Sequence, residues 1–162
     1  MKAAVHASRF SVLGFLELAM PTILHATLEQ DGPSTSKATV RSHTVFVDRP
    51  AAKGGADRGP LGGEYLLVAL GGCFSSHLLA AIRTREAPIT GVRVAVFGTL
   101  DGSPERFTAF EVAVDATCDD RELLEKLVAI AERACQVIGT LRQAAPVVVT
   151  VNAAAASQAG TV

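Results

Sequence analysis

The sequence predicts an α+β fold, in which blocks of antiparallel strands are separated by single helices. Three observations predict it: paired runs with an apolar repeat of two residues, one long helix that is apolar nearly all round, and a second helix followed by a last strand. The chain has 162 residues, of which 49% are hydrophobic, which suits one domain with a sizeable core.

The first pair of strands is predicted at residues 22–28 and 38–48. Residues 22–28 alternate between two faces, and Asp31-Gly32 then supplies a turn. Residues 38–48 are rich in β-branched side chains and end before Pro50. We therefore expect an antiparallel hairpin with a loop longer than two residues.

A glycine-rich loop and a long helix follow. Residues 49–63 hold five Gly and two Pro and are predicted to form a surface loop. The helix predicted over Glu64–Arg83 is about 30 Å long at 1.5 Å per residue. Its apolar side chains lie nearly all round, so we expect it to be buried, in a core or against a partner. Gly71-Gly72 in its middle predicts the close approach of another backbone.

The second half repeats the pattern. Residues 92–100 and 106–116 alternate as a second hairpin. Asp119 and Glu122 match a capping box, and apolar residues then recur at helical spacing up to Gly139. A last strand is predicted at residues 146–151, and residues 152–162 are predicted to be a frayed tail. Residues 1–21 are an extension of uncertain status. The predicted domain is therefore residues 22–151.

Composition excludes several classes of function. A net charge of −1 and 5% aromatic residues argue against nucleic-acid binding. The apolar run Phe10–Met20 is interrupted by Glu17 and is shorter than the roughly 20 residues of a membrane span, so we expect no membrane partner. Three cysteines without a C-x-x-C pair are typical of a cytoplasmic protein with free thiols.

Two of those cysteines lie on the apolar sides of the two predicted helices. Alone, Cys73 or Cys135 is most simply a small buried side chain. Two helices packed on one sheet could, however, bring the thiols together. A thiolate that attacks a peroxide becomes a sulfenic acid, which a second thiol condenses to a disulfide.

That chemistry needs a cation near the attacking sulfur. The candidates are Arg41, Arg49 and Arg58, from the preceding strand and loop, and Glu64 is placed to hold a guanidinium in a bidentate pair. The sequence alone does not choose among the three arginines.

Other side chains could carry chemistry but fit plainer explanations. His77 follows Cys73 by four residues, and with Cys135 it could supply part of a metal site. A closed zinc site needs a fourth ligand that the sequence does not offer, so we expect neither a metal nor a cofactor, and a metal-dependent hydrolase ranks last. Cys118, beside a predicted helix start, is taken as incidental.

One string is distinctive. Gly59-Pro60, then Glu64, then Leu66–Cys73 (LLVALGGC) resembles the G-P-x-P-x-E-L-L-L-A-A-L-G-G-C signature of the OsmC/Ohr family, the OsmC-like hydroperoxide reductases. The resemblance runs from Thr22 to Val151. The chain departs from it at two places: Gly62 replaces the second proline, and Gln136 stands where proline is common.

The resemblance implies an intertwined homodimer in which each long helix is buried against its twin. It further implies that Cys73 is the peroxidatic and Cys135 the resolving cysteine, while Glu64 orients a catalytic arginine. Organic hydroperoxides would be the substrates in oxidative-stress defence, and a dithiol, for example a lipoyl protein, the reductant. The alternative is a non-catalytic homodimer of the same fold that binds a small molecule or acts structurally.

Overall fold

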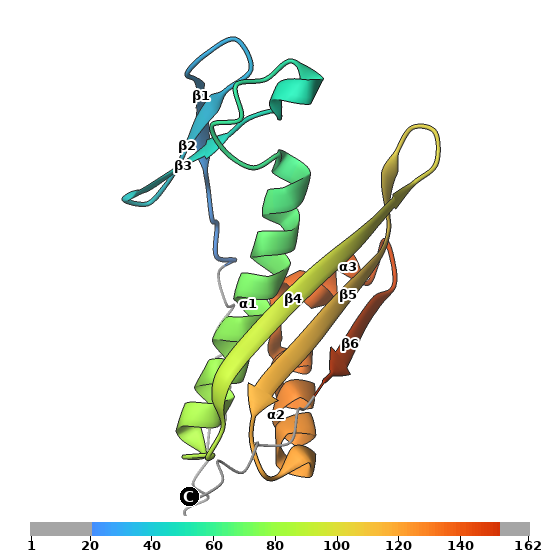
Figure 1. The fold of residues 1–162 in the computed structure, drawn as a ribbon. Helices are drawn as coiled ribbons and strands as arrows, with labels where there is room; N and C mark the ends of the chain where they lie inside the picture. The colour runs from blue at the N-terminus through green and yellow to red at the C-terminus, as the bar shows by residue number, and fades with distance from the viewer. Residues whose placement is uncertain (1–20, 153–162) are drawn as a thin grey trace, which may run out of the picture.

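The computed structural model describes residues 21–152. Apart from Pro21 and Asn152, the expected extension and tail lie outside the described residues. The elements follow one another along the chain in the order of Figure 1: β1 (Thr27–Gln30), β2 (Ser36–Val40), β3 (His43–Val47), a 3₁₀ turn η1 (Ala51–Lys53), α1 (Gly62–Thr84), β4 (Thr90–Asp101), β5 (Arg106–Thr117), α2 (Arg121–Ala134), α3 (Gln136–Leu141) and β6 (Val147–Val151).

Two separate three-stranded sheets confirm the predicted α+β class. The N-terminal sheet has the order β1-β2-β3 and is antiparallel throughout. In the C-terminal sheet, β4 and β5 are antiparallel, whereas β6 runs parallel to β5. The N-terminal sheet lies at the start of α1, and the C-terminal sheet lies along the side of the helix (Figure 1).

The first predicted hairpin is a three-stranded meander. The strand expected at 38–48 is two strands, β2 and β3, which fold back on each other after Arg41 and pair from Val40↔His43 onward. Arg41 has a positive φ of 54°, an uncommon backbone conformation for a side chain other than glycine. The alternation of apolar residues continues across this turn, and no Gly, Pro or Asn marks it, so the pattern reads as one strand.

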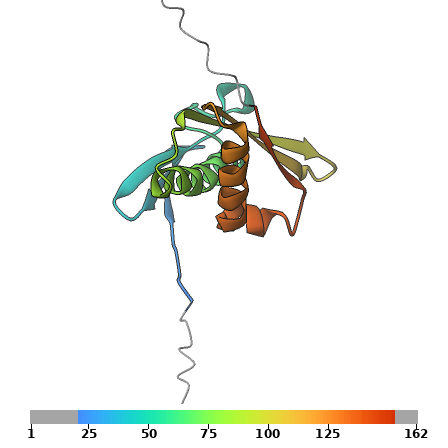
Figure 2. The ribbon, with the colours of Figure 1, turned by 90° about the horizontal axis from the view of Figure 1, so that it is seen from below.

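One face of α1 forms the core with α2 and the C-terminal sheet. Both helices lie on the same side of that sheet (Figure 2). The buried side chains of α1 recur at spacings of three and four residues, and they are Leu70, Phe74, Leu78, Ala81 and Ile82. They meet alternate residues of β5, among them Val112 and Val114, which are fully buried. Burial of this stripe is what orients the helix.

The opposite face of α1 is open in the single chain. Val68 is 60% exposed and Leu79 is 49% exposed. A helix buried all round was expected, and this chain alone covers one side of it. By length and composition α1 would also fit a membrane span, although its other face belongs to the core.

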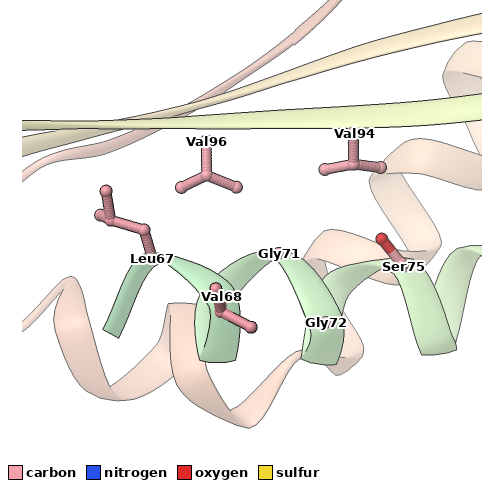
Figure 3. A pocket seen from close by; sticks show the side chains of 7 residues that line it. All are labelled: Leu67, Val68, Gly71, Gly72, Ser75, Val94 and Val96. Carbon is pink, nitrogen blue, oxygen red and sulfur yellow. The ribbon is translucent and has the colours of Figure 1, made fainter. Parts of the chain in front are cut away.

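The two glycines of α1 differ in their surroundings. A Cβ on Gly71 would lie 2.9 Å from Cγ2 of Val96, whereas a Cβ on Gly72 would meet nothing within 4 Å. Figure 3 shows Val96 of β4 pointing at this part of the helix, above a shallow groove lined by both glycines. The close approach at Gly71 is therefore that of a side chain, and Gly72 belongs to the open face.

The second helix is shorter than predicted and is broken. Asp120, one residue after the expected position, caps α2 by accepting the Leu123 N–H at 2.9 Å. At Cys135 the backbone is extended, with ψ of 110°, and α3 starts at Gln136. The apolar spacing that predicted one helix to Gly139 continues through the break, which no glycine or proline signals.

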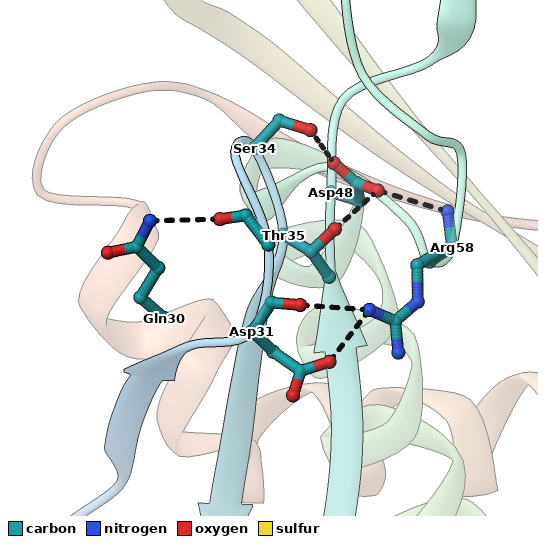
Figure 4. A network of polar contacts seen from close by, with 7 residues as sticks. Gln30, Asp31, Ser34, Thr35, Asp48 and Arg58 are labelled. Atoms are coloured by element: carbon teal, nitrogen blue, oxygen red, sulfur yellow. Dashed lines mark hydrogen bonds and ion pairs between the residues drawn. The ribbon is translucent and has the colours of Figure 1, made fainter.

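A buried carboxylate ties the N-terminal sheet to the glycine-rich loop (Figure 4). Asp48 is 2% exposed and accepts hydrogen bonds from Ser34 Oγ at 2.7 Å and Thr35 Oγ1 at 2.9 Å. The backbone N–H groups of Arg49 and Arg58 also donate to it, at 2.7 and 3.2 Å. Burial alone would raise the pKa of Asp48, but these four hydrogen bonds outweigh it and hold the pKa well below its usual range.

We predict that Asp48→Asn destabilises the protein at pH 7, because the amide cannot accept all four hydrogen bonds. The folded pKa is lowered, so the stabilisation is present above the ordinary carboxyl pKa of about 4 and is lost as pH falls below it. Thermal unfolding of wild type and variant from pH 7 to 2 should show the difference in Tm narrowing below about pH 4.

The matched control is Asp119→Asn, which alters an exposed carboxylate with no side-chain hydrogen bond recorded within residues 21–152. It should leave Tm nearly unchanged at every pH. A difference in Tm between Asp48→Asn and wild type that stays constant down to pH 2 would contradict the role given to Asp48.

Candidate functional site

The break between α2 and α3 places the second cysteine beside the long helix. Cys73 projects from the middle of α1 and is partly buried, while Cys135 at the break is 2% exposed. Both belong to the region where α1, α2 and α3 pack together. The expectation that two helices on one sheet bring these thiols together is met in the single chain, because the two side chains are close enough to interact electrostatically.

Cys135 is the thiol that this environment keeps protonated. Burial is the largest influence and raises its pKa, and the neighbouring Cys73 side chain raises it further. The backbone N–H groups of Ile138 and Val137 act in the opposite direction; Ile138 donates to the sulfur at 3.5 Å. The net effect is a raised pKa, so at neutral pH Cys135 is a thiol.

An amide bridges Cys73 to a histidine on the same helix. The Cys73 thiol donates to Oε1 of Gln136 at 3.4 Å, and His77 Nε2 lies 3.4 Å from the same oxygen. Sequence reasoning treated Gln136 only as a departure from a family pattern. The signal that could have found it is its place directly after Cys135.

Two of the side chains predicted to activate Cys73, Arg58 and Glu64, have other contacts in this chain. Arg58 pairs with Asp31 at 2.7 Å, donates to the Asp31 carbonyl at 3.1 Å, and stacks over Phe46 with its guanidinium carbon 4.5 Å from the ring centre. Glu64 accepts the Leu61 N–H at 2.7 Å and so caps α1. Both side chains help to hold the N-terminal end of α1 and the loop before it.

The two remaining arginines are exposed. Arg41 forms the turn between β2 and β3, and the side chain of Arg49 makes no hydrogen bond or ion pair recorded within residues 21–152. Glu64 and Cys73 lie nine residues apart on α1, which is about 13 Å along the axis and on opposite faces of the helix. A guanidinium held by Glu64 therefore cannot also contact Cys73 of the same chain.

The other candidate ligands form no metal site in the described part of the chain. Within residues 21–152 the structure shows no group of three His, Cys, Asp or Glu side chains able to hold a metal ion. Cys118 is buried in the core at the end of β5. His77 takes part in the amide bridge.

Fold and site together define a class: an α+β protein that holds two free cysteines, one accessible and one buried, against a long central helix. The chain matches the family model described as OsmC-like protein over residues 54–150. This match spans more than half of the sequence. The chain therefore belongs to the OsmC-like family.

Solved structures share the fold at low sequence identity. A hypothetical protein from Aquifex aeolicus superposes with a TM-score of 0.72 at 14% identity, covering 83% of this chain and 98% of that one. An OsmC like protein from Mycoplasma pneumoniae gives 0.70 at 15% identity, covering 84% and 99%. An organic hydroperoxide resistance protein from Elizabethkingia anophelis gives 0.66 at 17% identity, covering 85% and 100%. No curated protein matches the sequence.

We predict that Cys73 is alkylated at least about tenfold faster than Cys118 or Cys135 at pH 8, because it alone is accessible and Cys135 has a raised pKa. Brief treatment with iodoacetamide, followed by peptide mass spectrometry, measures the three rates. The rate at Cys135 should still be rising above pH 9, the ordinary thiol value. Equal labelling of Cys73 and Cys135 in the native protein would contradict this assignment.

Proposed function

We propose that the protein is a thiol-dependent reductase of organic hydroperoxides, with Cys73 peroxidatic and Cys135 resolving. The observation that carries the proposal is the pairing of an accessible thiol with a buried, protonated one within interaction range. Membership of the OsmC-like family supports it, as does the likeness in fold to the organic hydroperoxide resistance protein from Elizabethkingia anophelis. Apolar side chains around Cys73 on α1 favour organic peroxides over hydrogen peroxide.

The reaction divides into three balanced steps. The Cys73 thiolate attacks the peroxide, so an S–O bond forms, the O–O bond breaks, and the alkoxide leaves and is protonated to an alcohol. The Cys135 thiol then displaces the sulfenic oxygen, which departs as water with the Cys135 proton, and leaves a Cys73–Cys135 disulfide. An external dithiol such as a lipoyl group reduces it by two thiol–disulfide exchanges.

The cation that activates Cys73 is proposed to come from a second copy of the chain. Arg58 is paired with Asp31, and Glu64 lies too far along α1 from Cys73 to hold a guanidinium against it, so neither contact supplies a cation to Cys73 within the described part of one chain. The open apolar face of α1, which includes Val68 and Leu79, offers a surface for a twin helix. We assign this role to Arg49, which is exposed and lies nearer in sequence to α1 than Arg41, the other exposed candidate.

We predict that Cys73→Ser reduces peroxide consumption by at least about a hundredfold, because serine cannot supply the attacking thiolate. Cys135→Ser should still be oxidised at Cys73, but should accumulate sulfinic acid in place of the disulfide. Loss of cumene hydroperoxide in the presence of a dithiol, with mass spectrometry of the Cys73 peptide, measures both effects. Cys118→Ser is the matched control and should consume peroxide at the wild-type rate. Peroxide turnover that persists in Cys73→Ser would contradict the assignment of Cys73.

A mixing experiment tests the arginine and the dimer together. Arg49→Ala and Cys73→Ser should each be inactive alone. If Arg49 serves the other copy, refolding the two together should restore about a quarter of the wild-type sites, because half of the random dimers carry one intact site of two. Refolding each variant with itself is the control.

The alternative, a non-catalytic homodimer of this fold, predicts a different outcome. The contacts of Arg58 and Glu64 favour it to the extent that, within residues 21–152, both side chains are engaged with groups other than Cys73. In that case wild type should bury the open face of α1 in a dimer, yet should form no Cys73–Cys135 disulfide under peroxide. No activity in the mixed dimers, with an active wild type, would instead reject Arg49 as the partner.

A further inference from the structure

Gln136 is held so that its side chain reaches back to α1. It is the first residue of α3, and the Thr140 hydroxyl donates to its carbonyl oxygen at 2.9 Å. Two residues on, Ile138 is fully buried, which fixes this turn of α3 in the core. The backbone of Gln136 is therefore anchored, while its side-chain amide extends over Cys73.

The contact between Gln136 and Cys73 exists in one redox state only. A reduced Cys73 carries the S–H that Gln136 Oε1 accepts at 3.4 Å. In a disulfide that hydrogen is gone, and the carbonyl oxygen faces a sulfur with no proton to donate. An interaction made by the dithiol and lost in the disulfide favours the dithiol.

We propose that Gln136 is a positioning residue that shifts the Cys73–Cys135 couple toward the dithiol, so that the disulfide is more easily reduced. The inference rests on the proposed pairing of the two cysteines. The couple exchanges two electrons and two protons, which pass to or from an external thiol–disulfide pair such as glutathione. Easier reduction would speed the return to the peroxide-reactive state.

His77 holds the amide in place in both states. Its Nε2 lies 3.4 Å from the same oxygen, and in the tautomer that carries the proton on Nε2 it donates to that oxygen whatever the redox state of Cys73. It keeps the oxygen, rather than the amide nitrogen, directed at Cys73. His77 thus acts through Gln136 and needs no direct contact with the sulfur.

The test is a redox titration of the full chain in glutathione buffers, quenched by alkylation and read by mass spectrometry. Gln136→Leu removes the acceptor and should stabilise the disulfide about threefold, which lowers the midpoint potential by about 14 mV for a two-electron couple. The shift is small because S–H is a weak donor. Gln136→Glu keeps an acceptor oxygen and should titrate at or above the wild-type midpoint.

Two further variants separate this effect from a general change in α3. Gln143→Leu makes the same chemical change at an exposed position just after α3 and should leave the midpoint at the wild-type value. Adding His77→Phe to Gln136→Leu should produce no further shift, because His77 acts only through the amide. A further shift in the double variant would contradict that part of the inference.

The results of the redox titration and of the peroxide assay distinguish failure of this inference from failure of the proposed function. A Gln136→Leu midpoint equal to or above wild type, or a Gln136→Glu midpoint that falls with it, overturns the inference even if peroxide is reduced. A disulfide that titrates as expected without any peroxide turnover supports the inference and removes the proposed function. If wild type forms no Cys73–Cys135 disulfide in any buffer, both are rejected.

Discussion

The break in the helix at Cys135 is the constraint on which the arrangement of the site depends. Had the helix run on to Gly139, as its apolar spacing suggests, the residues after α2 would have continued along one axis. The extended backbone at Cys135 turns the chain instead, and α3 packs against α1. As a result the Cys135 sulfur caps α3 through Ile138, and Gln136 reaches Cys73.

Burial then gives the two thiols different environments. Cys135 lies inside the core, where desolvation raises its pKa, so a thiol rather than a thiolate faces Cys73. Cys73 packs against the edge of the core and remains partly accessible. The polar side chains of Arg58 and Glu64 are engaged elsewhere, where they help to hold the N-terminal end of α1.

The N-terminal sheet is organised by Asp48 more than by apolar burial. Its carboxylate gathers two hydroxyls and two backbone N–H groups, and it thereby fixes the course of the loop that leads into α1. Arg58 is drawn into this arrangement by Asp31 and Phe46. Arg58 is one of the three arginines predicted for Cys73, and proximity in sequence does not show that in this chain its guanidinium meets Asp31.

The sequence by itself determined the α+β class, the alternation of strand groups with helices and the long central helix, because local periodicity and turn residues carry that information. The string that ends at Cys73 singled out Cys73 and Cys135 as the candidate thiols. Only the tertiary structure decided the turn at Arg41, the break at Cys135, the bridge through Gln136, and which face of α1 is covered. These depend on contacts between residues far apart in the chain. An apolar pattern records that a side chain is to be buried, but not against what.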